Sequence, residues 1–371
     1  MTAGRRAGPR RLVPVLAAIA FAAVGAGCSG PPPATPPIQM TPVDPSAAIG
    51  PSPKSPAEAS PPEGSTGSAI VARPHGLLLL AGRPGAMALE LIEDHGERRP
   101  VPLPDPRVAW LSSSLDGRLL ATTLDGWAFV SDAILGDALP TWHRLAAAGI
   151  GPTALAGPPS FGSLAPDGTR AALVAGDFGT SAPSDILVVP VDGSTGSVVR
   201  IHRPADGAPP GWIDRRVVVL TRTQDDRVGS TILDLVGGTQ TYGPGPVAAP
   251  GPAGMAGWIE PIAGLSIAAD GSRLAVASAA DGRIEVHPAE AWLAGADTTA
   301  EPVELLPERD GSRSYAWLGL SASGDRLAVV RTNSDGDSVA VTLHDRATGW
   351  AQGRRIALPT GADRAVVAWL P

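Results

Sequence analysis

The feature that most constrains the fold is a short sequence repeat that recurs along most of the chain. It consists of a short apolar segment, a turn of Asp and Gly, and a second apolar segment. It occurs in residues 107–122 (RVAWLSSSLDGRLLAT), 161–174 (FGSLAPDGTRAALV), 262–277 (IAGLSIAADGSRLAVA) and 315–330 (YAWLGLSASGDRLAVV). Asp-Gly between apolar runs is a strong hairpin signal, because the turn requires a positive φ. Each copy therefore predicts a β-hairpin.

Two weaker copies fill the gaps: residues 70–81 have His75-Gly76 at the turn, and residues 211–221 have Asp214-Arg215. The six turns then lie 41 to 56 residues apart. Third strands follow the hairpins, as in residues 184–196, 280–288 and 337–349. A period near 50 residues with several short strands is typical of a propeller blade. We expect an all-β fold in residues 69–371, a β-propeller of six four-stranded blades, with five or seven blades as alternatives.

The repeat resembles a known family. Ala165-Pro166-Asp167-Gly168 is similar to the PD40 (WD40-like) repeat of the TolB-like propellers, whose signature is an aromatic residue, Ser-Pro-Asp-Gly and an apolar strand. The resemblance covers most of residues 69–371 and implies the fold. TolB also carries an α/β domain, where this chain has a Pro-rich segment, so the role of TolB is not transferred. The last residues, 365–371 (AVVAWLP), echo the first half of the repeat and predict a strand that closes the ring on the first blade.

The alternation of side chains along these strands predicts how the blades pack. Leu274 and Val276 should face one neighbouring blade, and the small Ala275 and Ala277 the other. The similar phrases VAWL, YAWL and VAWL place Trp110, Trp317 and Trp369 at equivalent core positions. Three further tryptophans follow a third strand and are expected to be more exposed, with ligand stacking as the alternative: Trp142, Trp292 and Trp350.

The N-terminus has the three-part plan of a secretory signal. Arginines precede an apolar run from Leu12 to Val24, which is shorter than the roughly 20 residues of a membrane span, and small residues lead to Cys28. This resembles the bacterial lipobox, although Gly25 stands where that family prefers a large aliphatic residue. The resemblance implies cleavage after residue 27 and lipidation of Cys28; the alternative is an ordinary signal cut nearby. Arg10-Arg11 leaves the export route open between the general secretory and twin-arginine systems.

Residues 28–68 should form a disordered tether. Pro recurs every few residues with small and polar residues between, and no aromatic residue occurs. Such a segment cannot bury enough apolar surface to offset its ordering entropy. We therefore divide the chain into a signal peptide (1–27), a lipidated tether (28–68) and the propeller (69–371), located on the outer face of the cell membrane.

Charge and composition limit the kinds of binding partner that we expect. Acidic residues outnumber basic ones by 36 to 29 in the whole chain, and removal of a signal containing four arginines widens the gap. An acidic surface disfavours nucleic acid. With one cysteine, no intramolecular disulfide can form. Lys54 is the only lysine, which points to a GC-rich genome such as that of an actinobacterium.

No catalytic constellation is evident in the sequence. Gly25, Gly27 and Gly30 match the dinucleotide pattern G-x-G-x-x-G, but they lie across the predicted cleavage site, so no cofactor is expected. The chain lacks G-x-S-x-G and H-E-x-x-H patterns. His287 and His344 fall at similar places in their repeats and could converge as metal ligands, but repeat-derived positions explain them more simply. Asn333, Asp335 and Asp337 space like the start of a calcium loop, which then fails at Ser338 and His344. A solvated hairpin turn is the simpler interpretation of that segment.

The sequence thus predicts a lipid-anchored extracytoplasmic propeller that binds or scaffolds an envelope protein or ligand. The membrane, through Cys28, and an envelope protein of unknown identity are the expected partners. The alternative is a propeller-type hydrolase or lactonase whose polar groups meet only at a channel mouth.

Overall fold

The structure is a computed structural model that describes residues 75–134, 138–145, 159–176, 182–194, 196–201, 209–222, 228–243, 262–278, 283–294, 300–305, 315–333 and 337–371. All of them lie within one unit, Gly67–Pro371. The predicted signal peptide, Cys28 and the tether lie outside the described residues. Among the helices that are described, none is long and apolar enough to cross a membrane.

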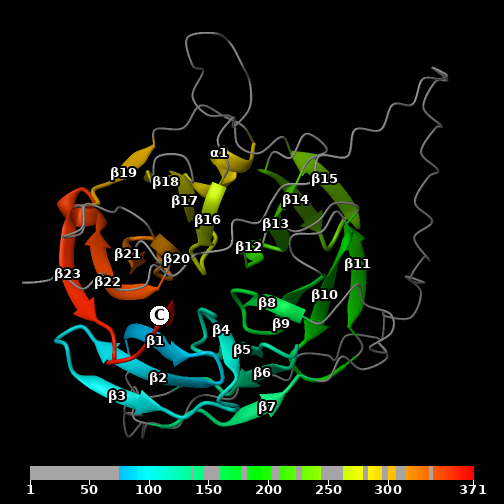
Figure 1. The fold of residues 1–371 in the computed structure, drawn as a ribbon. Helices are drawn as coiled ribbons and strands as arrows, with labels where there is room; N and C mark the ends of the chain where they lie inside the picture. Colours follow the sequence, from blue (N-terminus) through cyan, green and yellow to red (C-terminus); the bar gives the residue numbers. More distant parts are fainter. Residues whose placement is uncertain are drawn as a thin grey trace, which may run out of the picture. The chain divides into compact units, whose positions relative to one another are not determined.

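The described strands form six four-stranded antiparallel sheets that follow one another around a ring (Figure 1). Blade 1 contains β24 (Arg364–Leu370), β1 (Gly76–Arg83), β2 (Ala86–Glu93) and β3 (Arg98–Val101). Blade 2 contains β4 (Val108–Ser113), β5 (Leu119–Thr123), β6 (Ala128–Ser131) and β7 (Trp142–Arg144). Blade 3 contains β8 (Pro159–Leu164), β9 (Arg170–Ala175), β10 (Ser184–Pro190) and β11 (Ser197–Ile201).

The other three blades have the same order of strands. Blade 4 contains β12 (Gly211–Ile213), β13 (Arg216–Arg222), β14 (Val228–Asp234) and β15 (Thr239–Gly243). Blade 5 contains β16 (Ile262–Ile267), β17 (Arg273–Ser278), β18 (Ile284–Pro288) and β19 (Glu301–Val303), with a short helix α1 (Ala289–Leu293) after β18. Blade 6 contains β20 (Tyr315–Leu320), β21 (Arg326–Thr332), β22 (Ser338–Asp345) and β23 (Gln352–Ala357), with the 3-10 turn η3 (Arg346–Thr348) after β22. The predicted six-bladed, all-β propeller is confirmed.

The turns between the first and second strands are formed as the repeat predicts. The glycines of the four strong copies all have positive φ, between 68° and 87°: Gly117, Gly168, Gly271 and Gly324. In three of these turns an Asp carboxylate accepts the backbone N–H two residues on, as Asp270 does from Ser272 at 2.8 Å. Neighbouring turns are also joined, because Asp270 N–H donates to the carbonyl oxygen of Ala322 at 3.0 Å. One sequence signal therefore builds each hairpin and helps to align adjacent blades.

The ring closes with the last strand of the chain, as predicted. The inner strand of blade 1 is β24, which pairs with β1 from Gly76↔Leu370 to Gly82↔Arg364. The prediction of a turn at His75-Gly76 was wrong. Gly76 is the first residue of β1, and both edges of this strand are occupied, by β24 on one side and β2 on the other.

Apolar clusters fill the spaces between neighbouring blades. Leu274 and Val276 pack with Ile213, Val218 and Leu220 of blade 4. Ala275 and Ala277 instead belong to the cluster shared with blade 6, which confirms the predicted alternation. The described residues provide one such cluster at each of the six interfaces. The core of the molecule is thus a set of similar interfaces, and it leaves a channel along the axis.

Candidate functional site: the central channel

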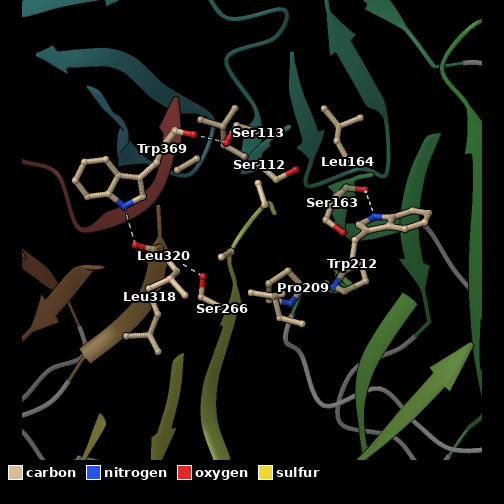
Figure 2. Close-up of a pocket in the computed structure, with 18 of the residues that line it drawn as sticks. Ser112, Ser113, Ser163, Leu164, Pro209, Trp212, Ser266, Leu318, Leu320 and Trp369 are labelled. Atoms are coloured by element: carbon tan, nitrogen blue, oxygen red, sulfur yellow. Dashed lines mark hydrogen bonds between the residues drawn. The ribbon is translucent and has the colours of Figure 1, made fainter. Parts of the chain in front are cut away.

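The inner strands β4, β8, β12, β16, β20 and β24 surround a central cavity of about 90 Å³ (Figure 2). Its wall is made of serine, glycine, alanine, proline, leucine, isoleucine, valine and tryptophan residues. Among the described residues that line it, none is Asp, Glu, His, Lys or Arg. This part of the channel is therefore uncharged at any ordinary pH.

Three aromatic rings meet across the channel near the beginnings of the inner strands. The ring centroids of Trp110 and Trp317 are 4.8 Å apart, and Phe161 lies 5.7 Å from Trp110 and 6.0 Å from Trp317. Blades 3 and 6 lie opposite each other in the ring, so the contact between Phe161 and Trp317 spans the axis. The rings fill the channel at this level, and the cavity lies toward the ends of the inner strands.

Hydrogen bonds between neighbouring blades satisfy many polar groups in the wall. The indole N–H of Trp212 donates to the carbonyl oxygen of Ser163 at 3.2 Å, and that of Trp369 donates to Gly319 at 2.8 Å. Figure 2 shows these two tryptophans on facing sides of the cavity. The hydroxyl of Ser113 donates to the carbonyl oxygen of Trp369, and Ser266 Oγ accepts from the N–H of Leu320 at 2.9 Å. The wall is therefore braced between blades.

Two hydroxyls in the wall stand apart from this network. Ser112 Oγ and Ser163 Oγ are buried, line the cavity and have no hydrogen-bond partner among the described residues. A buried hydroxyl without a partner costs free energy, so these atoms favour a water molecule or a neutral polar ligand group in the cavity. No base lines the described wall to activate either hydroxyl as a nucleophile. The chemistry of the cavity is thus suited to binding a neutral group.

A second depression lies between blades 6 and 1, with a volume of about 270 Å³. Arg326 donates to Asp94 Oδ1 at 2.6 Å in this groove, and Arg354 donates to the carbonyl oxygen of Asp94 at 3.4 Å. Trp369 lines both this groove and the central cavity, with the Arg326 guanidinium 5.8 Å from its ring centroid. The closing strand therefore separates the two depressions.

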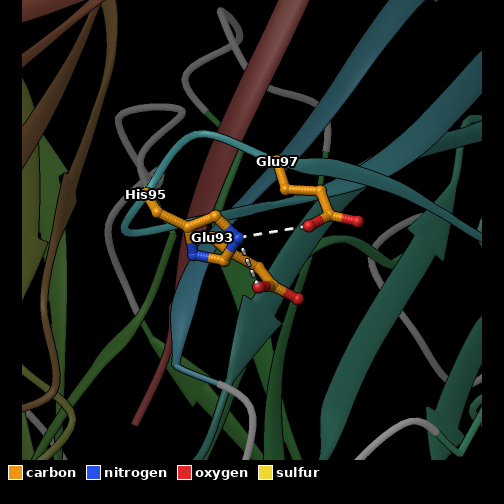
Figure 3. A group of neighbouring side chains, drawn as sticks. All are labelled: Glu93, His95 and Glu97. Atoms are coloured by element: carbon orange, nitrogen blue, oxygen red, sulfur yellow. Dashed lines mark hydrogen bonds and ion pairs between the residues drawn. The ribbon is translucent and has the colours of Figure 1, made fainter.

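A group that the sequence analysis did not single out lies on the rim of this groove. Glu93, His95 and Glu97 occupy the turn between β2 and β3, and Figure 3 shows the imidazole between the two carboxylates. His95 Nε2 is 3.3 Å from Glu93 Oε2 and 3.2 Å from Glu97 Oε2. The sequence signal for this group is the spacing E-x-H-x-E. In a tight hairpin turn this spacing brings the three side chains together, so the group could be found from the sequence once such a turn is expected there.

The two histidines singled out from the sequence do not converge on a site. They pair in equivalent registers, Leu274↔His287 and Leu327↔His344, on different blades. His344 Nδ1 lies 3.1 Å from the carbonyl oxygen of Trp350, so it carries the proton, and Nε2 can accept from Thr342 Oγ1 at 3.2 Å. Burial lowers the pKa of His344 below its ordinary value, which keeps the ring neutral. His287 is also buried, with Nε2 3.4 Å from Glu285.

The candidate calcium loop is only partly described. Asp335 lies outside the described residues. Asn333 Oδ1 accepts the N–H of Asp337 at 2.9 Å, and Asn333 N–H donates to the carbonyl oxygen of Asp337 at 2.9 Å. These two bonds join the end of β21 to the residue before β22.

Two predictions about tryptophans were wrong. Trp292 and Trp350 are 2% and 1% exposed, because α1 and the turn after η3 carry them into the clusters between blades. Trp369 is buried as predicted, but it is not equivalent to Trp110 and Trp317. It pairs with Leu77 near the beginning of β1, whereas Trp110 and Trp317 pair with Thr122 and Val330 near the ends of β5 and β21. The shared motif Ala-Trp-Leu did not reveal this difference in register.

Fold and channel together define a six-bladed β-propeller with an uncharged central cavity in its described part. The family model of the lipoprotein LpqB β-propeller domain matches residues 163–361, more than half of the chain. The chain belongs to this family. No curated protein matches it.

Solved structures share the fold at low sequence identity. A chain from the crystal structure of a nidogen/laminin complex is 15% identical, with 80% of this chain and 99% of that chain covered and a TM-score of 0.51. TolB from Acinetobacter baumannii is 12% identical, with 80% of this chain and 67% of that chain covered and a TM-score of 0.51. These likenesses show the fold alone, and they bear out the expected TolB-like propeller.

Proposed function

We propose that the chain is an extracytoplasmic lipoprotein, anchored through Cys28, whose propeller binds an envelope protein or ligand at the channel. The single observation that carries the binding role is the cavity wall. It combines tryptophan rings, apolar side chains and two buried hydroxyls without partners, and its described residues provide no acid, base or activated nucleophile. Membership of a lipoprotein domain family supports the envelope location. The hydrolase alternative has no support from the described wall.

The anchor is tested by Cys28→Ser. Loss of the thiol removes the atom that would receive the diacylglyceryl group, and stable attachment requires such acyl chains. We expect the wild type to incorporate labelled palmitate and to sediment with membranes. The variant should lose the label and appear in the medium, or accumulate unprocessed. A variant that is processed and retained like the wild type would show that Cys28 is not the anchor.

The binding role is tested by filling the cavity. The anchored wild type is used as bait for cross-linked capture from membranes, beside Ser112→Gln, which places a longer side chain in the cavity. Val236→Ser, at a residue that is 63% exposed, is the matched control. A partner that copurifies with the wild type and the control but not with Ser112→Gln supports binding at the channel. Equal recovery with all three baits contradicts it, provided that thermal unfolding shows each bait to be folded.

A further inference from the structure

The turn between β2 and β3 carries three potential metal ligands on a well-defined backbone. Gly96 N–H donates to the carbonyl oxygen of Glu93 at 2.8 Å, and Glu93 N–H donates to that of Glu97 at 2.9 Å. Gly96 has a φ of 100°, which glycine adopts without strain. The backbone thus holds residues 93, 95 and 97 in a tight turn, with all three side chains on one side.

Among the described residues, no arginine or lysine forms an ion pair with the two glutamates of this turn. The ion-pair partner that the structure provides for the carboxylates of Glu93 and Glu97 is in both cases the same imidazole, that of His95. One imidazole brings at most one positive charge against two negative ones. Arg354 lies beside Gly96 of the same turn and donates to the Asp94 carbonyl. A cation between the three side chains would neutralise the remaining charge.

The distances fit a small transition-metal ion. Zn²⁺ binds nitrogen and oxygen ligands at about 2.0–2.2 Å, so two ligands of a tetrahedral site lie roughly 3.3–3.5 Å apart. The observed separations from His95 Nε2 are 3.3 and 3.2 Å, and the ligand atoms of all three residues lie within 4.8 Å of one another. We propose that Glu93, His95 and Glu97 form a Zn²⁺ site, with the fourth position open to water.

The ligand set argues for Zn²⁺ over the common hard cations. Imidazole suits zinc and its neighbours in the first transition series, whereas Ca²⁺ and Mg²⁺ favour all-oxygen sites. Glu93 also lines the groove between blades 6 and 1, so the metal would sit at its rim. This inference rests on the turn alone and does not depend on the lipid anchor or on the role of the channel.

The test is a titration of ZnCl₂ into the full chain, purified in detergent without a histidine tag and followed by calorimetry. The variants are His95→Gln and Glu97→Gln. His143→Gln is the matched control, because His143 is also exposed and lies 3.2 Å from a single carboxylate, Asp132. Since loss of an outer-shell partner already costs about 10–100-fold in metal affinity, loss of a ligand should cost at least tenfold.

We expect the wild type and His143→Gln to bind one Zn²⁺ with equal affinity, and each ligand variant to bind it at least tenfold more weakly. Equimolar Ca²⁺ should not compete. The proposal is overturned if the wild type does not bind Zn²⁺, if both ligand variants bind it as well as the wild type, or if Ca²⁺ competes equally. All three substitutions are at exposed side chains, and thermal unfolding of each variant without metal checks that the fold is intact.

Discussion

At the scale of single residues, Glu301 shows how one side chain joins two blades. It lies in β19 of blade 5 and accepts hydrogen bonds from Arg273 of the same blade and from Arg346 and Trp350 of blade 6, at 2.8 to 3.1 Å. Partial burial opposes ionisation, but the bonds from Arg346, Trp350 and Arg273 outweigh it and lower the pKa of Glu301 to about 2. The ionised carboxylate is therefore part of the interface between blades 5 and 6.

Glu301→Gln should destabilise the propeller near neutral pH by up to about 3 kcal/mol, because a depressed pKa stabilises the folded state once the group is ionised. The contribution is present above the ordinary glutamate pKa of about 4.5 and is lost as the pH falls toward about 2. Urea unfolding of wild type and variant at several pH values measures it. The difference in free energy should be largest above pH 5 and shrink as the pH approaches 2. A difference independent of pH would assign the effect to packing.

Individual side chains also mark the limit of prediction from sequence. The Asp-Gly turns could be placed because their signal is local, a positive φ between two apolar runs. The burial of Trp292 and Trp350 could not, because it depends on how α1 and the segment after η3 return to a neighbouring blade. The uncharged cavity wall was equally hidden, since it is assembled from six strands distant in sequence. Hydrophobic periodicity predicts which face of a strand is buried. It does not predict which strand lies opposite across the channel.

At the scale of elements, one glycine of an inner strand lies where the second strands of two blades leave no room for a side chain. A Cβ on Gly162 of β8 would lie 2.5 Å from Leu173 Cδ2 and 2.8 Å from Leu120 Cδ2 of blade 2. On Gly264 of β16, the nearest atoms would be at 3.7 Å, an ordinary contact. Of these two glycines in similar strands, Gly264 leaves room for a methyl group and Gly162 does not. Only Gly162 is therefore required by the packing around its strand.

Gly162→Ala should destabilise the protein by about 1–3 kcal/mol, the cost of overpacking a filled core. Gly264→Ala is the control and should be neutral or stabilising by up to about 1 kcal/mol, since it restricts the unfolded chain without a clash. Chemical denaturation of the two variants beside the wild type measures both changes. Equal effects at the two positions would contradict the argument from close approach.

At the scale of the whole molecule, the ring depends on β24. Its alternating side chains contribute to two interfaces: Val366, Ala368 and Leu370 face the cluster with blade 2, and Ala365, Val367 and Trp369 the cluster with blade 6. The sequence allowed this closure to be predicted from the echo of the repeat in the last residues. It did not allow prediction of the register, in which the Trp369 indole N–H reaches the Gly319 carbonyl across the interface.

Deletion of residues 364–371 should therefore abolish cooperative unfolding, because it strips both interfaces of blade 1 and exposes the edge of β1 to aggregation. Trp369→Phe is the milder counterpart: it keeps most of the apolar surface but removes the indole N–H, leaving the Gly319 carbonyl without that donor at a cost of about 1–3 kcal/mol. Calorimetric melting compares the three proteins. A deletion variant that melts like the wild type would mean that the other five blades hold the ring closed without β24. A Trp369→Phe variant as stable as the wild type would instead assign the contribution of Trp369 to packing alone.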